Sequence, residues 1–204
     1  FNTAGNWDPS GVPTSGQAVF IGGRAISANA TVTLDSSTHT VGNTYVGAGN
    51  NTFPDPVVTL NLSGTGSLTP TGLYLGQTRD ATGTVNQSGG TMAVGSQFRI
   101  GVAFGAGLQS TGIYNLSGGT LSLNSGFIEL GHSSGGSGST VGTFNLTGGG
   151  VTAPAMTIRA GSTLTDNGVG SLNISSITNE GTITFNNAAA ATRTNSISGT
   201  GVLT

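Results

Sequence analysis

Apolar and polar residues alternate in short runs along most of the chain. In two of these runs the apolar members are Tyr114 and Leu116, and Phe144 and Leu146, each pair separated by an asparagine. A period of two predicts half-buried β-strands. No stretch free of glycine shows the period of 3.6 that an amphipathic helix requires. We therefore expect an all-β fold.

One phrase centred on asparagine returns along the chain. It reads GTVNQSGGT over Gly83–Thr91, GIYNLSGGT over Gly112–Thr120 and GTFNLTGGG over Gly142–Gly150, with weaker copies at Thr59–Thr65 and Ser171–Ser175. The shared residues are Asn61, Asn86, Asn115, Asn145 and Asn173, so the spacings are 25, 29, 30 and 28 residues. A period in this range indicates a repeat architecture.

A second phrase, apolar–any–apolar–Gly, keeps a constant register to the first. It occurs at Leu73–Gly76, Phe98–Gly101 and Ile128–Gly131, with degenerate copies at Tyr45–Gly47 and Met156–Ile158. The segments that vary most follow this phrase, as expected when loops leave one edge of a repeating coil. These segments are Ala48–Pro56, Gln77–Thr82, Val102–Thr111 and His132–Val141.

Together the two phrases predict a parallel β-solenoid, a stack of coils in which equivalent strands lie about 4.8 Å apart. About seven coils fit, giving a rod roughly 34 Å long. Leu116 and Leu146 should stack inside it. We expect two inward ladders, Leu60/Val85/Tyr114/Phe144/Leu172 and Leu62/Gln87/Leu116/Leu146/Ile174. Gln87 interrupts the second ladder and is either solvated at a coil edge or bonded to the backbone inside.

The chain is expected to form one domain over residues 1–204. Residues 1–16 form an irregular N-terminal segment that covers the first coil, residues 17–170 carry the repeats of 25–30 residues, and residues 171–204 form shorter coils. The Gly-Gly pairs are placed where the chain turns between strands, because glycine adopts positive φ without steric strain.

Composition removes several classes of protein. The 204 residues include 37 Gly, 5 Arg, 7 acidic residues, no Lys and no Cys, with a net charge of −2. Nucleic-acid binding needs concentrated basic residues, so we expect no nucleic-acid partner. No apolar run reaches the length of a membrane span, and disulfides are excluded. The first residue is Phe1 rather than Met, which fits a removed signal peptide or a trimmed chain.

The Asn–apolar–Ser–Gly–Gly–Thr phrase followed by apolar–any–apolar–Gly resembles the repeats of bacterial secreted β-helix proteins. The closest groups are autotransporter passenger-like repeats and large surface proteins with a C-terminal sorting signal. Gly5–Pro9 and Val12–Ile21 look like the start of the mature region in such proteins, and Ile197–Thr204 is similar to their Gly-Thr-Gly coil phrase. The resemblance implies the fold and a secreted, bacterial cell-surface setting, and it implies no activity.

Residues with catalytic potential are sparse, so we expect no catalytic residue, no cofactor, no metal site and no enzymatic activity. Arg99 and Glu129 occupy equivalent repeat positions and should form a cross-strand ion pair on the outside, with Arg159 close to the same column. His132 opens a Gly/Ser loop, where no acid is expected to orient it. The loop also lacks the Asp of a calcium-binding turn.

Two other side-chain patterns have structural explanations. Each repeat asparagine begins an Asn-x-Ser/Thr triplet, but the alignment favours a hydrogen-bonded asparagine ladder over glycosylation. Thr-x-Thr pairs such as Thr31–Thr33 and Thr182–Thr184 suggest ice binding, which needs a threonine array in every coil. Along the sequence these pairs are scattered, which does not favour that function.

Two classes of function remain. The first is a non-enzymatic extracellular structural protein that assembles with itself into a fibre or matrix. The second is an adhesin or glycan-binding rod, in which Tyr45, Tyr74 and Trp7 could stack on sugar rings. A polysaccharide lyase is a weaker third class, because the acids are not clustered.

Self-assembly is expected to be head to tail, giving a homo-oligomer. The candidate interface residues are Phe1, Trp7, Val102, Phe104, Leu108, Val202 and Leu203. Val102–Leu108 is an unusually apolar segment for a loop, and Ser196–Thr204 is strand-like and carries no charged side chain. An unprotected strand edge is a template for another strand. In a longer natural chain, further coils would follow Thr204 instead.

Overall fold

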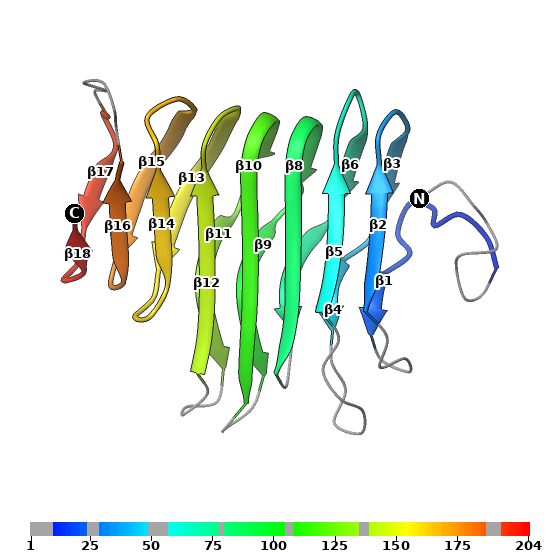
Figure 1. Ribbon diagram of the computed structural model, residues 1–204, viewed down its shortest axis with the longest axis horizontal. Helices are drawn as coiled ribbons and strands as arrows, with labels where there is room; N and C mark the ends of the chain where they lie inside the picture. Colours follow the sequence, from blue (N-terminus) through cyan, green and yellow to red (C-terminus); the bar gives the residue numbers. More distant parts are fainter. Residues whose placement is uncertain are drawn as a thin grey trace.

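The computed structural model describes residues 10–23, 29–48, 57–77, 80–104, 108–134, 139–186 and 193–204, and in these ranges the regular structure is all β, without a helix. Every strand pairing is parallel, and consecutive coils follow one another along a single axis (Figure 1). The chain is therefore a parallel β-solenoid, which confirms the predicted fold class.

Each coil contributes to three columns of stacked strands. The first column contains β1 (Val19–Gly23), β4 (Thr44–Ala48), β7 (Gly72–Gln77), β9 (Gln97–Phe104), β11 (Phe127–Ser134), the ends of β13 (Gly150–Ile158) and β15 (Ser171–Asn179), and β17 (Ser196–Ser198).

The second column contains β2 (Ala30–Leu34), β5 (Val57–Leu62), the starts of β8 (Ala81–Val94) and β10 (Gln109–Leu123), β12 (Ser139–Leu146), β14 (Thr163–Asp166), β16 (Thr182–Phe185) and β18 (Val202–Leu203). The third column contains β3 (Thr38–Val41), β6 (Ser67–Pro70), the ends of β8 and β10, and the starts of β13 and β15.

The apolar side chains of the alternating runs fill the interior of the solenoid. Leu116 pairs with Leu146 in the adjacent strand, and both are fully buried, as predicted. Tyr114 lies between two phenylalanines: its ring is 5.3 Å from that of Phe144, stacked, and 5.1 Å from that of Phe98, edge-on. Identical registers in neighbouring coils thus place like side chains in contact along the axis.

Gln87 is satisfied inside the core. Its side chain is fully buried, and its Nε2 donates to the carbonyl oxygens of Thr120 at 2.9 Å and Gly90 at 3.3 Å. The buried hydroxyl of Tyr114 donates to its Oε1. The sequence leaves open whether Gln87 is solvated at a coil edge or bonded to the backbone inside, and the second is correct.

The last members of both predicted ladders are wrong. After Phe144 the column continues to Leu164, and after Leu146 it continues to Asp166. Leu172 and Ile174 belong to the third column, where they pair with Val151 and Ala153. The phrase at Ser171–Ser175 repeats the alternation of the earlier copies, but it lies on a different side of the coil.

The Gly-Gly pairs bend long strands that continue from the second column into the third. The second glycine of each pair, such as Gly119 at φ 77°, has positive φ, as expected. The first glycine touches backbone: a Cβ at Gly118 would overlap the carbonyl oxygen of Ser88 in the adjacent coil. Thus β8 and β10 stay paired on both sides of the turn, with register shifts between Leu116 and Thr120.

Other glycines join the first and second columns within the solenoid, and we call these contacts the glycine seam. A Cβ on Gly83 would overlap the oxygen of Val46, one on Gly112 the nitrogen of Gly101, and one on Gly142 the oxygen of Ile100. At the glycine seam, backbone therefore packs directly on backbone with no side chain between the two columns.

The variable segments are shorter than expected from the sequence. Val102 and His132 pair with each other in β9 and β11, and Thr111 and Val141 pair in β10 and β12. Strands β9 and β11 therefore continue past the phrase apolar–any–apolar–Gly, and strands β10 and β12 begin before the variable segments end.

Candidate functional site

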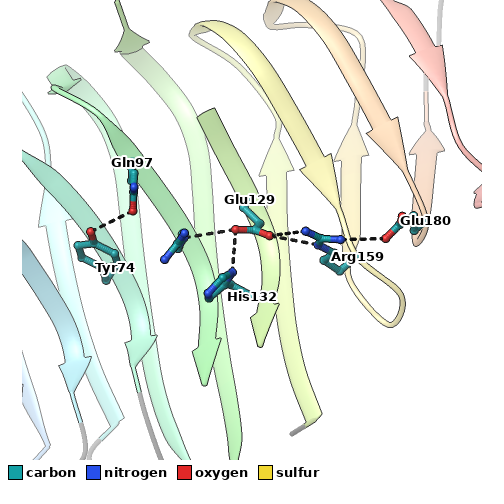
Figure 2. Close-up of polar contacts among 7 residues, drawn as sticks. Tyr74, Gln97, Glu129, His132, Arg159 and Glu180 are labelled. Carbon is teal, nitrogen blue, oxygen red and sulfur yellow. Dashed lines mark hydrogen bonds and ion pairs between the residues drawn. The ribbon is translucent and has the colours of Figure 1, made fainter. Parts of the chain in front are cut away.

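A network of charged side chains lies on the outer face of the first column and is the strongest cluster of ionisable groups in the described part of the chain (Figure 2). Arg99 of β9 and Glu129 of β11 are register partners, as predicted. Arg99 Nε lies 3.3 Å from Glu129 Oε2. Arg159, just after β13, reaches back and donates from Nη2 and Nε to Glu129 Oε1 at 2.9 and 3.1 Å.

Glu129 is buried although it points outward. Its side chain is only 5% exposed, so the expected exposed ion pair is instead a covered one. The stems and guanidinium groups of the two arginines enclose the carboxylate on either side along the axis. The network extends to Glu180, whose Oε2 is 3.4 Å from Arg159 Nη1.

His132 belongs to this network and not to a solvated loop. It lies within β11, and its Nδ1 is 2.9 Å from Glu129 Oε2. The expectation that no acid orients this histidine is therefore wrong. Burial lowers the pKa of His132, an effect that Glu129 opposes and Arg99 reinforces. The neutral ring donates its Nδ1 proton to the carboxylate.

The geometry makes Glu129 an anchor and not an accessible acid or base. Its Oε1 is occupied by Arg159, and its Oε2 by Arg99 and His132. The hydrogen bond to Glu129 raises the pKa of Arg159, so the guanidinium keeps its charge. The network thus ties β9, β11 and the end of β13 together across three coils. The described residues contain no group of three or more His, Cys, Asp or Glu placed to hold a metal ion.

Aromatic rings continue the same outward column toward the N-terminus. Phe20, Tyr45 and Tyr74 are successive register partners, and Tyr74 pairs with Arg99. The rings stack at centroid distances of 4.6 and 5.0 Å, nearly parallel. Stacked rings cover each other's faces, so Tyr45 offers solvent its edge and not the flat face that a sugar ring would need.

Tyr74 is further held by a hydrogen bond. Its hydroxyl donates to Gln97 Oε1 at 3.4 Å (Figure 2). Burial and the neighbouring Tyr45 raise its pKa, so the phenol keeps this proton. The stacking of its ring on Tyr45 and this hydrogen bond therefore explain the position of Tyr74 without a bound sugar. Trp7, the third ring considered for glycans, lies outside the described residues.

The candidate assembly residues differ in how far they are exposed to solvent. Val102 is fully buried in β9, so it does not form the exposed apolar loop expected there. Leu108 is half-buried. Val202 and Leu203 of β18 are each 55% exposed. Phe104 ends β9 with a side chain outside the described set, and Phe1 lies outside the described residues.

The asparagine ladder is confirmed for four of its five predicted members. Asn86 Nδ2 donates to Asn61 Oδ1 at 3.0 Å, and Asn115 and Asn145 each donate to the preceding asparagine at 2.8 Å. Asn173 is not part of it, because it pairs with Thr152 in the third column. The alignment of the asparagines therefore has a structural cause, the hydrogen bonds between successive coils.

Comparisons with known proteins give no match: no protein family, no curated protein and no solved structure is similar to this chain. No helix among the described residues is long and apolar enough to cross a membrane.

Proposed function

We propose that this protein is a non-enzymatic structural subunit of an extracellular fibre or matrix at the bacterial cell surface, in which copies stack head to tail. The observation that carries the proposal is the exposure of two apolar side chains: Val202 and Leu203 of β18 are each 55% exposed, in a strand that stays in register with β16.

The strand edges at this end favour stacking. β17 pairs with β15 and β18 pairs with β16, and within the described ranges neither strand has a partner on its opposite side. Such edges present N–H and C=O groups that can accept another strand. The columns are parallel throughout, so β1 and β2 of a second copy would continue the columns that end in β17 and β18.

A contact between unlike ends propagates as a filament instead of closing as a dimer. The N-terminal residues Phe1 and Trp7 are proposed to take part from the opposite end.

We also propose that the solenoid has about seven coils. The succession of pairings in the second column, from β2 through β5, β8, β10, β12, β14 and β16 to β18, supports this number.

Negative-stain electron microscopy and sedimentation velocity over a range of protein concentrations test the proposal. We expect filaments whose length grows with concentration. Replacing Val202 and Leu203 together by lysine should abolish them while the β-type circular dichroism persists. Val169→Lys is the matched control, because Val169 is 78% exposed in a turn away from β18, and it should leave the filaments intact.

Two results would contradict this function. One is a chain that stays strictly monomeric at high concentration. The other is a Val202→Lys/Leu203→Lys variant that assembles as well as the unaltered protein. Turnover of a polysaccharide that disappears in a Glu129→Gln variant would overturn the non-enzymatic assignment.

A further inference from the structure

The outer face of the second column carries two continuous ranks of side chains, which we call the Thr/Asn face. The first rank is Thr31, Thr59, Thr84, Ile113, Thr143, Thr163, Thr182 and Val202, each paired with the next. The second rank, two residues further along each strand, is Thr33, Asn61, Asn86, Asn115, Asn145, Thr165, Thr184 and Thr204. The Thr-x-Thr pairs Thr31–Thr33, Thr163–Thr165 and Thr182–Thr184 therefore lie in register, and in the four coils between the first and second of these pairs asparagine takes the second position.

No position of the Thr/Asn face is charged. The surface charges of the network around Glu129 lie instead on the first column, and Asp166 is buried inside the solenoid. The face also carries no aromatic ring. It therefore lacks the basic groups that bind nucleic acids and acidic peptides, and the aromatic rings that stack on sugars.

The side chains of the Thr/Asn face are held in fixed positions. Threonine is branched at Cβ and restricted at χ1 on a strand, so its methyl and hydroxyl groups take defined positions. The asparagine amides are fixed by hydrogen bonds of 2.8–3.0 Å to one another. Each amide has two N–H groups and an oxygen with two lone pairs, so the ladder leaves hydrogen-bonding capacity toward solvent.

The spacing of this grid is regular in two directions. Neighbouring strands repeat at about 4.8 Å along the axis, and the two ranks are about 6.7 Å apart along the strand. A rigid, uncharged grid of methyl and hydrogen-bonding groups matches a ligand that is itself a lattice. The rows of oxygen atoms on a prism face of hexagonal ice repeat at comparable distances in both directions.

We infer that the Thr/Asn face binds ice, through water molecules ordered between the threonine methyl groups and bonded to the hydroxyl and amide groups. Binding at this face uses the side of the solenoid, and of its members only Val202, the last of the first rank, also belongs to the proposed end contact. Replacing Thr143 in the middle of the first rank can therefore remove ice binding without affecting head-to-tail assembly.

The test uses the full chain and three measurements: thermal hysteresis, inhibition of ice recrystallisation, and partition of the protein into a slowly growing ice front. The informative variant is Thr143→Tyr, which places a large ring in the middle of the first rank. The matched control is Thr152→Tyr, an exposed outward threonine of β13 in the third column. Circular dichroism and thermal unfolding confirm that both variants fold.

We expect the unaltered chain and Thr152→Tyr to enter the ice and to show hysteresis, and Thr143→Tyr to lose most of both signals. Filament formation should be unchanged in both variants. Absence of hysteresis and of ice partition in the unaltered chain would overturn the inference, as would equal activity of the two variants. Binding to insoluble chitin or cellulose without any effect on ice would also overturn it, by assigning the face to a solid polysaccharide.

Discussion

Asp166 lies next to Leu146 in the same inward column, and its buried carboxylate is paired with Arg193. Arg193 donates from Nε to Oδ2 and from Nη2 to Oδ1, both at 2.6 Å, and also to the oxygen of Gly170 at 3.1 Å. Gly168 N completes the set at 2.8 Å. An ion pair thus replaces an apolar side chain near the C-terminal end of the core.

Removing only the arginine should be strongly destabilising. Arg193→Met leaves the Asp166 carboxylate buried without its counter-charge, and breaking a buried pair in this way costs about 3–5 kcal/mol. The double variant Asp166→Leu/Arg193→Met should recover much of this loss, because leucine continues the column of Leu146. Urea unfolding of the two variants measures both effects. A double variant no more stable than Arg193→Met would contradict the assignment.

Leu146→Ala should lower the free energy of unfolding by about 2–5 kcal/mol, because it opens a cavity next to Leu116 in a fully buried column. Chemical denaturation followed by circular dichroism measures the change. Val169→Ala is the control: Val169 is 78% exposed, and its truncation should change stability by no more than about 0.5 kcal/mol. Equal effects at the two positions would show that the register is wrong.

Tyr114 and Gln87 should be energetically coupled. Tyr114→Phe removes the donor to Gln87 Oε1 and leaves a buried acceptor without its partner, which costs about 1–3 kcal/mol. A cycle with Gln87→Leu and the double variant should be non-additive by about 0.5–3 kcal/mol. Additive stability losses in urea would mean that the hydroxyl and the amide act separately.

The folded protein should lose stability when the pH falls below 6.5, the ordinary histidine value. Burial lowers the pKa values of both His132 and His39 in the folded state. The unfolded chain then binds protons first, so stability is fully present above 6.5 and decreases as pH falls toward the lower folded values.

Melting temperatures at about pH 7.5 and about pH 5.5 test this dependence on histidine charge. A His132→Asn variant should show a smaller drop between the two conditions, because the amide can still donate to Glu129 and does not titrate. An unchanged drop would mean that His132 makes no contribution to it.

The sequence predicts the fold and the middle of the core, and it fails where the coils shorten. From Asn61 to Asn145 each coil carries both phrases, so alternation and spacing agree on one register. The next coil returns to the second column only 20 residues after Asn145, at Thr165. Leu172 has the right alternation for either the second or the third column, and a period of two cannot distinguish between sides of a coil.

The network around Glu129 is only partly visible in the sequence. Equal repeat positions identify the pairing of Arg99 with Glu129. Arg159 is not a register partner of Glu129, which pairs with Thr157, and it reaches the carboxylate only through its long side chain. His132 joins because β11 continues beyond Gly131, which no local signal indicates.

Because of the glycine seam, the geometry of the coil does not depend on the length of the connecting segments. Backbone contacts at Gly83, Gly112 and Gly142 close each coil before the chain leaves it, and the connection from β4 to β5 is longer than that from β7 to β8. Foreign peptides grafted between β4 and β5 should therefore be displayed along one edge of the rod without unfolding it, which makes the protein a scaffold for ordered arrays of epitopes.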